Sequence, residues 1–380
     1  MRGRTKRILL QLGLFLTALL FIIFANRPTS SSKTFAWTTV RYKTSSTSIP
    51  RARGVCPGLS DSSKPALVVA RVAADGDPDW LDALTDLYHS CVYTADAPMN
   101  TDSTYLQVPA NLGHESMAYL TFIIDNYDHI PSAGAVFVHG VRWAWHNDHP
   151  SYDNVALLAA LNISAAIAPW GYHNLRCDWS ASTCQVSTSP PQGSLETSML
   201  TVVEPWNARA VSDAALPHAL AVLFGGDDYH ASNVLLRRTD AVRAQCCAQF
   251  VVARDSIWRH TREEYVALRQ WLLDGSGNGD AVHNANAAPR DDRVSGRILS
   301  YVWHILFTRQ DDSIMGHSGS AHSGFDLRVL NRQSCPRADE CYCRLYGRCD
   351  LEGCTSPEGC QGQYRVPPNF KLPSDWGATH

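Results

Sequence analysis

The chain has 380 residues, of which 45% are hydrophobic and 18% are charged, a composition that excludes an intrinsically disordered protein and a multi-span membrane protein. Residues 1–64 hold eleven of the 33 Lys and Arg but one of the 36 acidic residues, so the remaining chain carries 22 basic and 35 acidic side chains. That excess of negative charge argues against nucleic acid as a partner, because nucleic-acid binding depends on cationic side chains.

The first predicted element is a membrane span at residues 8–25, whose only polar members are Gln11 and Thr17. Residues 1–7 contain four basic side chains, and such a flank stays in the cytosol. We therefore expect a single-pass type II signal anchor, with the body in the lumen of the Golgi or another secretory compartment. A cleaved signal peptide is the alternative.

Residues 26–64 are predicted to form a flexible stem. Fifteen of these 39 residues are Ser or Thr, and long apolar side chains are scarce, so ordering the segment would bury little apolar surface. A lumenal domain is expected at residues 65–330. A Cys-rich C-terminal segment is expected at residues 331–380.

Strands and helices alternate along the predicted domain. Three short apolar runs are typical of buried strands, at residues 66–71, 135–138 and 250–253. Helical spacing marks residues 115–127, 153–161 and the segments after Thr261 and Ser295. The alternation predicts an α/β fold with a mostly parallel sheet and helices on both faces, the broad type of GT-A nucleotide-sugar transferases.

All twelve cysteines follow the apolar run, which indicates an oxidising compartment. Six of them lie in residues 331–380 and predict a small disulfide-stabilised tail, with a zinc site as the weaker alternative. Cys177 and Cys184 are expected to close a local loop. Cys246 and Cys247 are expected to bond to separate partners.

Asn162 begins a glycosylation sequon and is expected at the surface. It is the one such sequon in the chain, and its use would also fit a body in the secretory pathway.

Polar residues gather just after the predicted strand 135–138, where open α/β sheets bind ligands. His146 and Asp148 offer a nitrogen and an oxygen ligand for Mn²⁺ or Mg²⁺, which would hold a donor diphosphate. A hydrogen-bonded structural loop explains the same residues. The expected substrate contacts are His139, Arg142, Trp145, Asn147, Arg176, Gln249 and Arg254.

Two carboxylates are candidates for a general base, Glu115 and Asp148. Glu115 stands at a predicted helix start, where capping explains its charge equally well. The acidic run Asp75, Asp77 and Asp79 follows the first strand and could hold a cation, although a solvated turn also accounts for it.

Several ordered segments carry a family resemblance: residues 111–128, 145–148, 171–177, 246–255, 295–304 and 341–347. Through them, residues 67–349 resemble a fungal family catalogued as domain of unknown function 3431. The chain departs from the family pattern at His114, where Arg is usual, and at Ser300, where Glu is usual. Residues 249–254 are also similar to a strand of branching N-acetylglucosaminyltransferases, which implies a transferase.

The anchor, the stem and the candidate residues lead to one hypothesis, a lumenal glycosyltransferase-like enzyme that moves a sugar from a nucleotide donor to a glycan acceptor. A non-catalytic glycan- or protein-binding module is the first alternative. A lumenal hydrolase is the second, because two carboxylates across a cleft would serve it as well.

Overall fold

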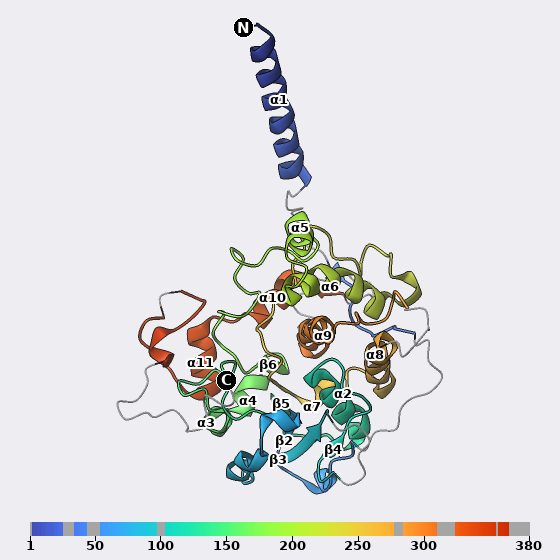
Figure 1. Cartoon of the computed structure of the whole chain (residues 1–380). Helices are drawn as coiled ribbons and strands as arrows, with labels where there is room; N and C mark the ends of the chain where they lie inside the picture. The colour runs from blue at the N-terminus through green and yellow to red at the C-terminus, as the bar shows by residue number, and fades with distance from the viewer. Residues whose placement is uncertain are drawn as a thin grey trace, which may run out of the picture.

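The computed structural model describes residues 2–25, 34–43, 54–96, 103–276, 284–309, 324–354 and 356–364. Helix α1 (Arg2–Ala25) projects from the body of the protein (Figure 1). Its stretch Lys6–Phe24 has a mean hydropathy of 2.3, and none of it is buried against the body. This apolar helix is consistent with a signal anchor.

A six-stranded sheet in the order β4-β3-β2-β5-β7-β6 forms the centre of the body. Its strands are β2 (Ala66–Arg71), β3 (His89–Thr94), β4 (Leu106–Gln107), β5 (Ala135–His139), β6 (Tyr172–Asn174) and β7 (Phe250–Val252). The first three neighbouring pairs in this order are parallel, and the two pairs that involve β7 are antiparallel. The fold is therefore α/β with a mixed sheet.

Helices cover both faces of the sheet. Successive side chains of a strand point to opposite faces, so Phe137 of β5 joins one core and Val138 joins the other. The first core includes α2 (Glu115–Asp125), α6 (Ala208–Gly225), α8 (Arg262–Gly275) and α9 (Asp292–Phe307). The second includes the 3-10 helix η3 (Pro78–Leu84), α3 (Asn154–Ala160), α4 (Ile163–Ile167) and α11 (Ala338–Tyr346).

The helix starts show how local hydrogen bonds set element boundaries. The predicted capping box is confirmed at α8, where Thr261 and Glu264 each bond to the other's backbone N–H. The expected start of α9 after Ser295 is wrong, because Asp291 caps the helix by accepting from the backbone N–H of Arg293 at 3.0 Å.

Part of the predicted stem belongs to the body. Strand β1 (Thr34–Phe35) pairs antiparallel with β8 (Phe325–Asp326), and Phe35 and Trp37 are fully buried. Farther along, Cys56 is disulfide-bonded to Cys91 in β3. The expectation of a continuous stem to residue 64 is therefore wrong, because a few aromatic and Cys anchors outweigh the Ser and Thr content. Residues 26–33 and 44–53 of that stretch lie outside the described residues.

The cysteine pairing differs from the expected one. Cys177 bonds to Cys341 in α11, and Cys184 bonds to Cys335 after α10 (Leu327–Ser334), so the predicted local loop is wrong. The expectation of separate partners for two adjacent cysteines is also wrong, since Cys246 and Cys247 bond to each other.

Two disulfides lie within the Cys-rich segment, Cys343–Cys349 and Cys354–Cys360, while Cys335 and Cys341 bond to cysteines that follow β6. The C-terminal segment is thus covalently tied to the loop that follows β6. With Cys56–Cys91 the body carries six disulfides and no free cysteine in its described part, which suggests an oxidising lumenal or extracellular location.

Candidate functional site

The order in which the strands are added to the sheet reverses between β2 and β5. From β2 it adds β3 and β4 on one side, and later β5 on the other side. In open α/β sheets the crevice beyond the carboxyl ends of the strands at such a point binds ligands. A cavity of about 190 Å³, here named the strand-end pocket, lies there, and its polar lining residues are Arg71, Asp75, Asn111, His114, Glu115 and His139.

Glu115 and His139 meet in the strand-end pocket. Glu115 is the first residue of α2 and His139 is the last residue of β5, with side chains 14% and 23% exposed. The Nδ1 atom of His139 lies 4.0 Å from Oε2 of Glu115, and its Nε2 lies 2.7 Å from the carbonyl oxygen of Cys247. Because a carbonyl only accepts, Nε2 is the nitrogen that carries the hydrogen, and Nδ1 faces the carboxylate.

Asp75 lines the same pocket at the end of the 3-10 helix η2 (Ala73–Asp75). Burial raises the pKa of the Asp75 carboxyl, while a hydrogen bond from the backbone N–H of Val72 and the nearby His139 and Arg71 oppose that rise. A carboxylate whose pKa is raised toward neutral pH suits proton transfer better than an ordinary one.

Gly140, directly after β5, permits the close approach of the carboxyl ends of β2 and β5. A Cβ atom at this position would lie 2.5 Å from Cβ of Arg71 and 2.7 Å from Oδ2 of Asp75. Any larger residue would therefore displace two polar residues of the strand-end pocket.

A second cavity, of about 230 Å³ and here named the outer cavity, shares Asp75 with the strand-end pocket and is also lined by Asp77, Trp80, Arg142 and Trp143. The guanidinium of Arg142 lies 4.2 Å from the ring centroid of Trp143. Its Nε and Nη2 donate to the carboxylate of Asp153 at 3.0 and 3.1 Å. The predicted contact Arg142 thus lies in a cavity wall, with its orientation fixed by Asp153.

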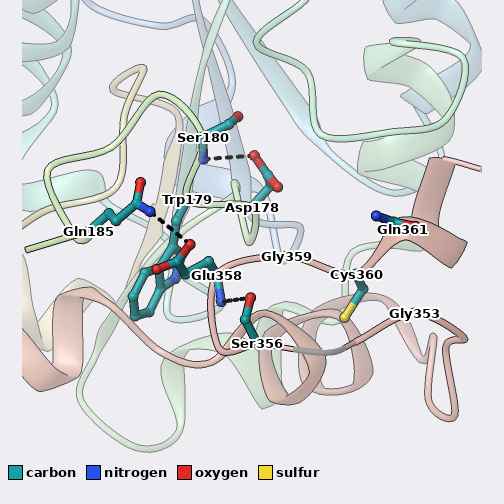
Figure 2. A pocket seen from close by; sticks show the side chains of 10 residues that line it. All are labelled: Asp178, Trp179, Ser180, Gln185, Gly353, Ser356, Glu358, Gly359, Cys360 and Gln361. Atoms are coloured by element: carbon teal, nitrogen blue, oxygen red, sulfur yellow. Dashed lines mark hydrogen bonds between the residues drawn. The ribbon is translucent and has the colours of Figure 1, made fainter. Parts of the chain in front are cut away.

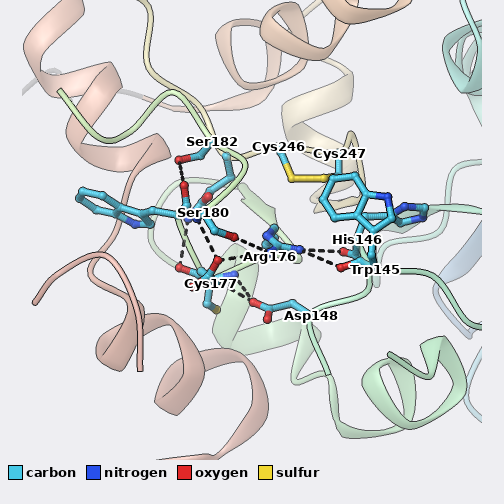
Figure 3. A network of polar contacts seen from close by, with 12 residues as sticks. Trp145, His146, Asp148, Arg176, Cys177, Ser180, Ser182, Cys246 and Cys247 are labelled. Carbon is cyan, nitrogen blue, oxygen red and sulfur yellow. Dashed lines mark hydrogen bonds and ion pairs between the residues drawn. A yellow bond between two sulfur atoms is a disulfide. The ribbon is translucent and has the colours of Figure 1, made fainter. Parts of the chain in front are cut away.

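The structure places Asp148 away from both cavities. Its buried carboxylate accepts from the backbone N–H of Cys177 at 2.7 Å (Figure 3). It also accepts from the backbone N–H of Asp178 at 3.1 Å and from the hydroxyl of Tyr342 at 2.9 Å. These donors join the loop after β6 to α11. They occupy the oxygens that a cation would need, so His146 and Asp148 do not fit the expected Mn²⁺ or Mg²⁺ site.

Trp145, His146 and Asn147 do not line the strand-end pocket, but two of them contact residues that line a cavity. The ring of His146 packs against that of His139, with centroids 4.5 Å apart. Asn147 is fully buried and donates to the carbonyl of Arg142 at 2.8 Å. Trp145 is 57% exposed but lines neither cavity.

Arg176 and Gln249 are buried, and each donates to or accepts from a backbone group of another segment. Arg176 donates to the carbonyl of Trp145 at 3.3 Å and to Asp178 at 3.2 Å (Figure 3). Gln249 accepts from the backbone N–H of His139 at 3.3 Å. Gln249 therefore holds the backbone of His139 at the pocket, whereas Arg176 joins the loop after β6 to the segment of Trp145.

Arg254 lies at the end of the strands opposite to the strand-end pocket. It begins α7 (Arg254–Ile257) just after the carboxyl end of β7, and β7 runs against β5, so that Val252 pairs with Ala135 at the start of β5. Its guanidinium contacts Asp255 and lies 4.5 Å from the ring centroid of Trp258. The structure therefore separates Arg254 from Glu115 and His139.

Sequence motifs did not identify Arg71 or the carbonyl of Cys247 as parts of the site. Arg71 could have been found as a charged residue at a strand's carboxyl end. Cys247 and His114 adopt φ angles of 80° and 51°, a rare conformation for residues other than glycine that clusters at functional sites. No sequence signal marks that backbone conformation.

A larger cavity of about 480 Å³ lies between the loop after β6 and the Cys-rich segment (Figure 2). Its polar side chains bond to one another: Gln185 donates to Glu358 at 3.0 Å, and Asp178 accepts from the backbone N–H of Ser180 at 2.9 Å. The predicted site residues, all of which the structure describes, do not line it. The strand-end pocket is therefore the better candidate.

Asn162 caps α4, where its side-chain oxygen accepts from the backbone N–H of Ala165 at 3.0 Å. The residue is exposed, as an asparagine that receives an N-linked glycan must be. Its glycosylation stays a prediction.

Residues 67–344 match the sequence model of a family described as "Protein of unknown function (DUF3431)", which is more than half of the chain. No curated protein and no solved structure matches the chain.

Proposed function

The chain belongs to the DUF3431 family, and we propose that it is a glycosyltransferase-like enzyme of a secretory compartment that transfers a sugar from a nucleotide donor to a hydroxyl of a glycan. The observation that carries this proposal is the strand-end pocket, which gathers Asp75, Glu115, Arg71 and His139. Two carboxylates and two basic groups at a strand-order reversal suit the transfer of a group away from a diphosphate.

The fold type supports the same proposal. Helices lie on both faces of a mixed sheet in which β2, β3, β4 and β5 are parallel, and the pocket lies beyond the carboxyl ends of β2 and β5. We propose a GT-A-like domain on this basis, with the Golgi as its compartment. Fold likeness alone does not assign a reaction, so the residues of the pocket must carry it.

In the proposed reaction the acceptor hydroxyl oxygen bonds to the anomeric carbon of the donor sugar. The bond from that carbon to the diphosphate oxygen breaks, and the nucleoside diphosphate leaves with the electron pair. The hydroxyl proton passes to the carboxylate of Glu115 or Asp75, and Arg71 stabilises the negative charge on the leaving group. The raised pKa of Asp75 favours its role as the proton acceptor.

The outer cavity would hold the nucleotide part of the donor. Trp143 offers an aromatic face, and Arg142 offers a fixed guanidinium for a phosphate. Asp75 and Asp77 in its wall provide the oxygen ligands that Mn²⁺ or Mg²⁺ prefers, and such a cation would neutralise the diphosphate.

The test uses the full chain in lipid nanodiscs with a panel of nucleotide sugars, with and without Mn²⁺, and measures donor binding and nucleoside diphosphate release. We expect release with at least one donor, and a loss of about 100-fold or more in Glu115→Gln and Asp75→Asn. Arg254→Gln, at the far edge of the sheet, is the matched control and should keep normal release. A natively folded chain that neither binds nor cleaves any donor would refute the proposal.

Glycoside hydrolysis is a second candidate, because Asp75 and Glu115 line one pocket and such hydrolysis needs a pair of carboxyl groups. It is distinguished by its independence of nucleotide. Sugar release from a glycan without any donor, abolished in Glu115→Gln, would favour the hydrolase.

A further inference from the structure

An exposed apolar surface lies on α5 (Leu195–Val203) and the turn that follows it. Met199, Val202, Val203 and Trp206 are 67%, 80%, 66% and 74% exposed, and we name these four residues the α5 patch. Thr197 is the one buried residue of α5, whereas a body helix ordinarily buries its apolar face. Four clustered apolar side chains of this size mark an interaction surface.

Helix α5, which carries the patch, lies at the end of the body nearest to α1 (Figure 1). The segment that follows α1 and the start of α5 contact the same loop. Trp37 donates its indole N–H to the carbonyl of Val234 at 3.0 Å, and a Cβ atom on Gly193 would lie 2.9 Å from the carbonyl oxygen of Arg237. The chain therefore enters the body beside the helix that carries the patch.

The connection to α1 is short. Eight residues separate Ala25 at the end of α1 from Thr34 at the start of β1. Fully extended, this length of chain spans about 30 Å. If α1 spans a bilayer, Thr34 stays within that distance of the membrane surface, and the end of the body that carries the α5 patch is held close to the lipid.

We propose that the α5 patch docks on the surface of the membrane in which α1 is anchored. Met199, Val202 and Val203 would lie among the acyl chains, and Trp206 at the headgroup level, where indoles are enriched. Arg237 and Arg238, exposed beside the start of α5, would contact lipid phosphates. The proposal requires that α1 is retained as an anchor, and it is independent of the enzyme's reaction.

The test measures quenching of tryptophan fluorescence by brominated phosphatidylcholine in nanodiscs that hold one copy of the full chain. Helix α1 contains no Trp, and the difference in emission between the native chain and a single Trp→Ser variant isolates the signal of one residue. We expect brominated lipid to remove at least half of the emission that Trp206→Ser eliminates. The emission that Trp145→Ser eliminates should be unchanged, and Trp145 is a suitable control because it is also exposed, at 57%.

A second variant, Val203→Glu, places a charge on the patch without altering the core, and it should abolish the quenching of Trp206 while the near-UV circular dichroism stays native. Absence of Trp206 quenching in single-copy discs would overturn the proposal. Shielding of Trp206 only in discs with two copies would identify a self-association surface instead. A reconstituted chain whose mass lacks residues 1–25 would also overturn it.

Discussion

The imidazole of His139 lies 4.0 Å from the carboxylate of Glu115, although 23 residues lie between them in the chain. The contact arises because α2 begins and β5 ends at the same edge of the sheet. Cys247 fixes the tautomer of the ring through its carbonyl oxygen. A helix start, a strand end and a backbone carbonyl thus bring one imidazole and one carboxylate together in the strand-end pocket.

Glu115→Gln keeps the shape of this side chain and removes its charge. We expect turnover to fall by about 100-fold or more, because a proton acceptor in the pocket is lost, with little change in thermal stability. Asp128→Asn, which alters an exposed carboxylate beyond the other end of α2, is the control and should behave as the native chain. Unchanged turnover in Glu115→Gln would assign this glutamate to helix capping alone.

Asp75→Asn should lower turnover and raise stability. Burial raises the pKa of Asp75 in the folded protein, so the folded state holds this proton more tightly than the unfolded chain does. The charged carboxylate therefore costs stability once the pH exceeds the folded-state pKa, and asparagine avoids that cost at pH 7. Differential scanning calorimetry should show a Tm higher by at most a few degrees.

The opposite result for Asp75→Asn, a lower Tm at pH 7, would mean that the carboxylate stabilises the fold through the hydrogen bond from Val72. If the native chain catalyses the proposed transfer, its turnover should fall as the pH drops through the raised pKa of Asp75, because the proton acceptor is then already protonated. This acid limb of the pH profile should shift when a like charge is added near Asp75.

The strands at 66–71 and 135–138 were predictable because their signal is local, a short run of apolar residues. The direction of β7 was not, because antiparallel pairing is set by the path of the chain between β6 and β7. That single reversal brings Gln249 beside His139 and carries Arg254 to the far edge.

In the candidate site, too, local patterns were predictable and contacts between distant segments were not. A carboxylate next to two tryptophans and a histidine predicts a ligand site, yet Asp148 is buried by contacts from Cys177 and Tyr342, which are remote in the chain. Glu115 was identified as a candidate because it begins a predicted helix, and His139 because it follows a predicted strand. Their mutual contact depends on the packing of α2 against the sheet, which no local pattern encodes.

Asp148→Ala should destabilise the protein and leave any cation dependence unchanged. Removal of the carboxylate leaves two backbone N–H groups and the hydroxyl of Tyr342 without their acceptor in a buried place. We expect a loss of about 3 kcal/mol in the free energy of unfolding, measured by urea denaturation. Tyr342→Phe, which removes one of these donors, should cost less. An unfolding midpoint of the native chain that drops in EDTA, but not in the variant, would instead indicate a metal at Asp148.

The disulfides should differ in their effect on stability according to the loops that they close. Cys177–Cys341 closes a separation of 164 residues, and Cys343–Cys349 one of 6. Because Cys184–Cys335 remains in place, the loop that Cys177–Cys341 closes runs through that bond and holds only about 15 residues. Loop-closure entropy therefore predicts a stabilisation of about 3 kcal/mol for Cys177–Cys341 and about 2 kcal/mol for Cys343–Cys349. Replacing each pair by alanines and comparing urea midpoints tests this order, and equal losses would show that native contacts around the short loop dominate.

His304 should make the fold sensitive to acid. It is buried in α9, its two ring nitrogens have no hydrogen-bond partner within the described part of the chain, and burial lowers the pKa of its imidazole to about 3. Between that pH and the ordinary value of about 6.5, the unfolded chain binds a proton that the folded chain does not. Stability therefore falls as the pH falls through this window, by up to about 1.4 kcal/mol per pH unit.

His304→Leu removes this titration, so its Tm should drop less between pH 7 and pH 5 than that of the native chain. His173, whose pKa is also lowered to about 3 by burial, retains part of the slope in the variant. His230→Leu changes an exposed histidine and should keep the full native slope. If His304→Leu and His230→Leu lose stability in parallel on acidification, protonation of His304 does not cause the acid sensitivity of the fold. Carboxylates such as Glu264, whose pKa is lowered by its hydrogen bond from His260, must then account for it.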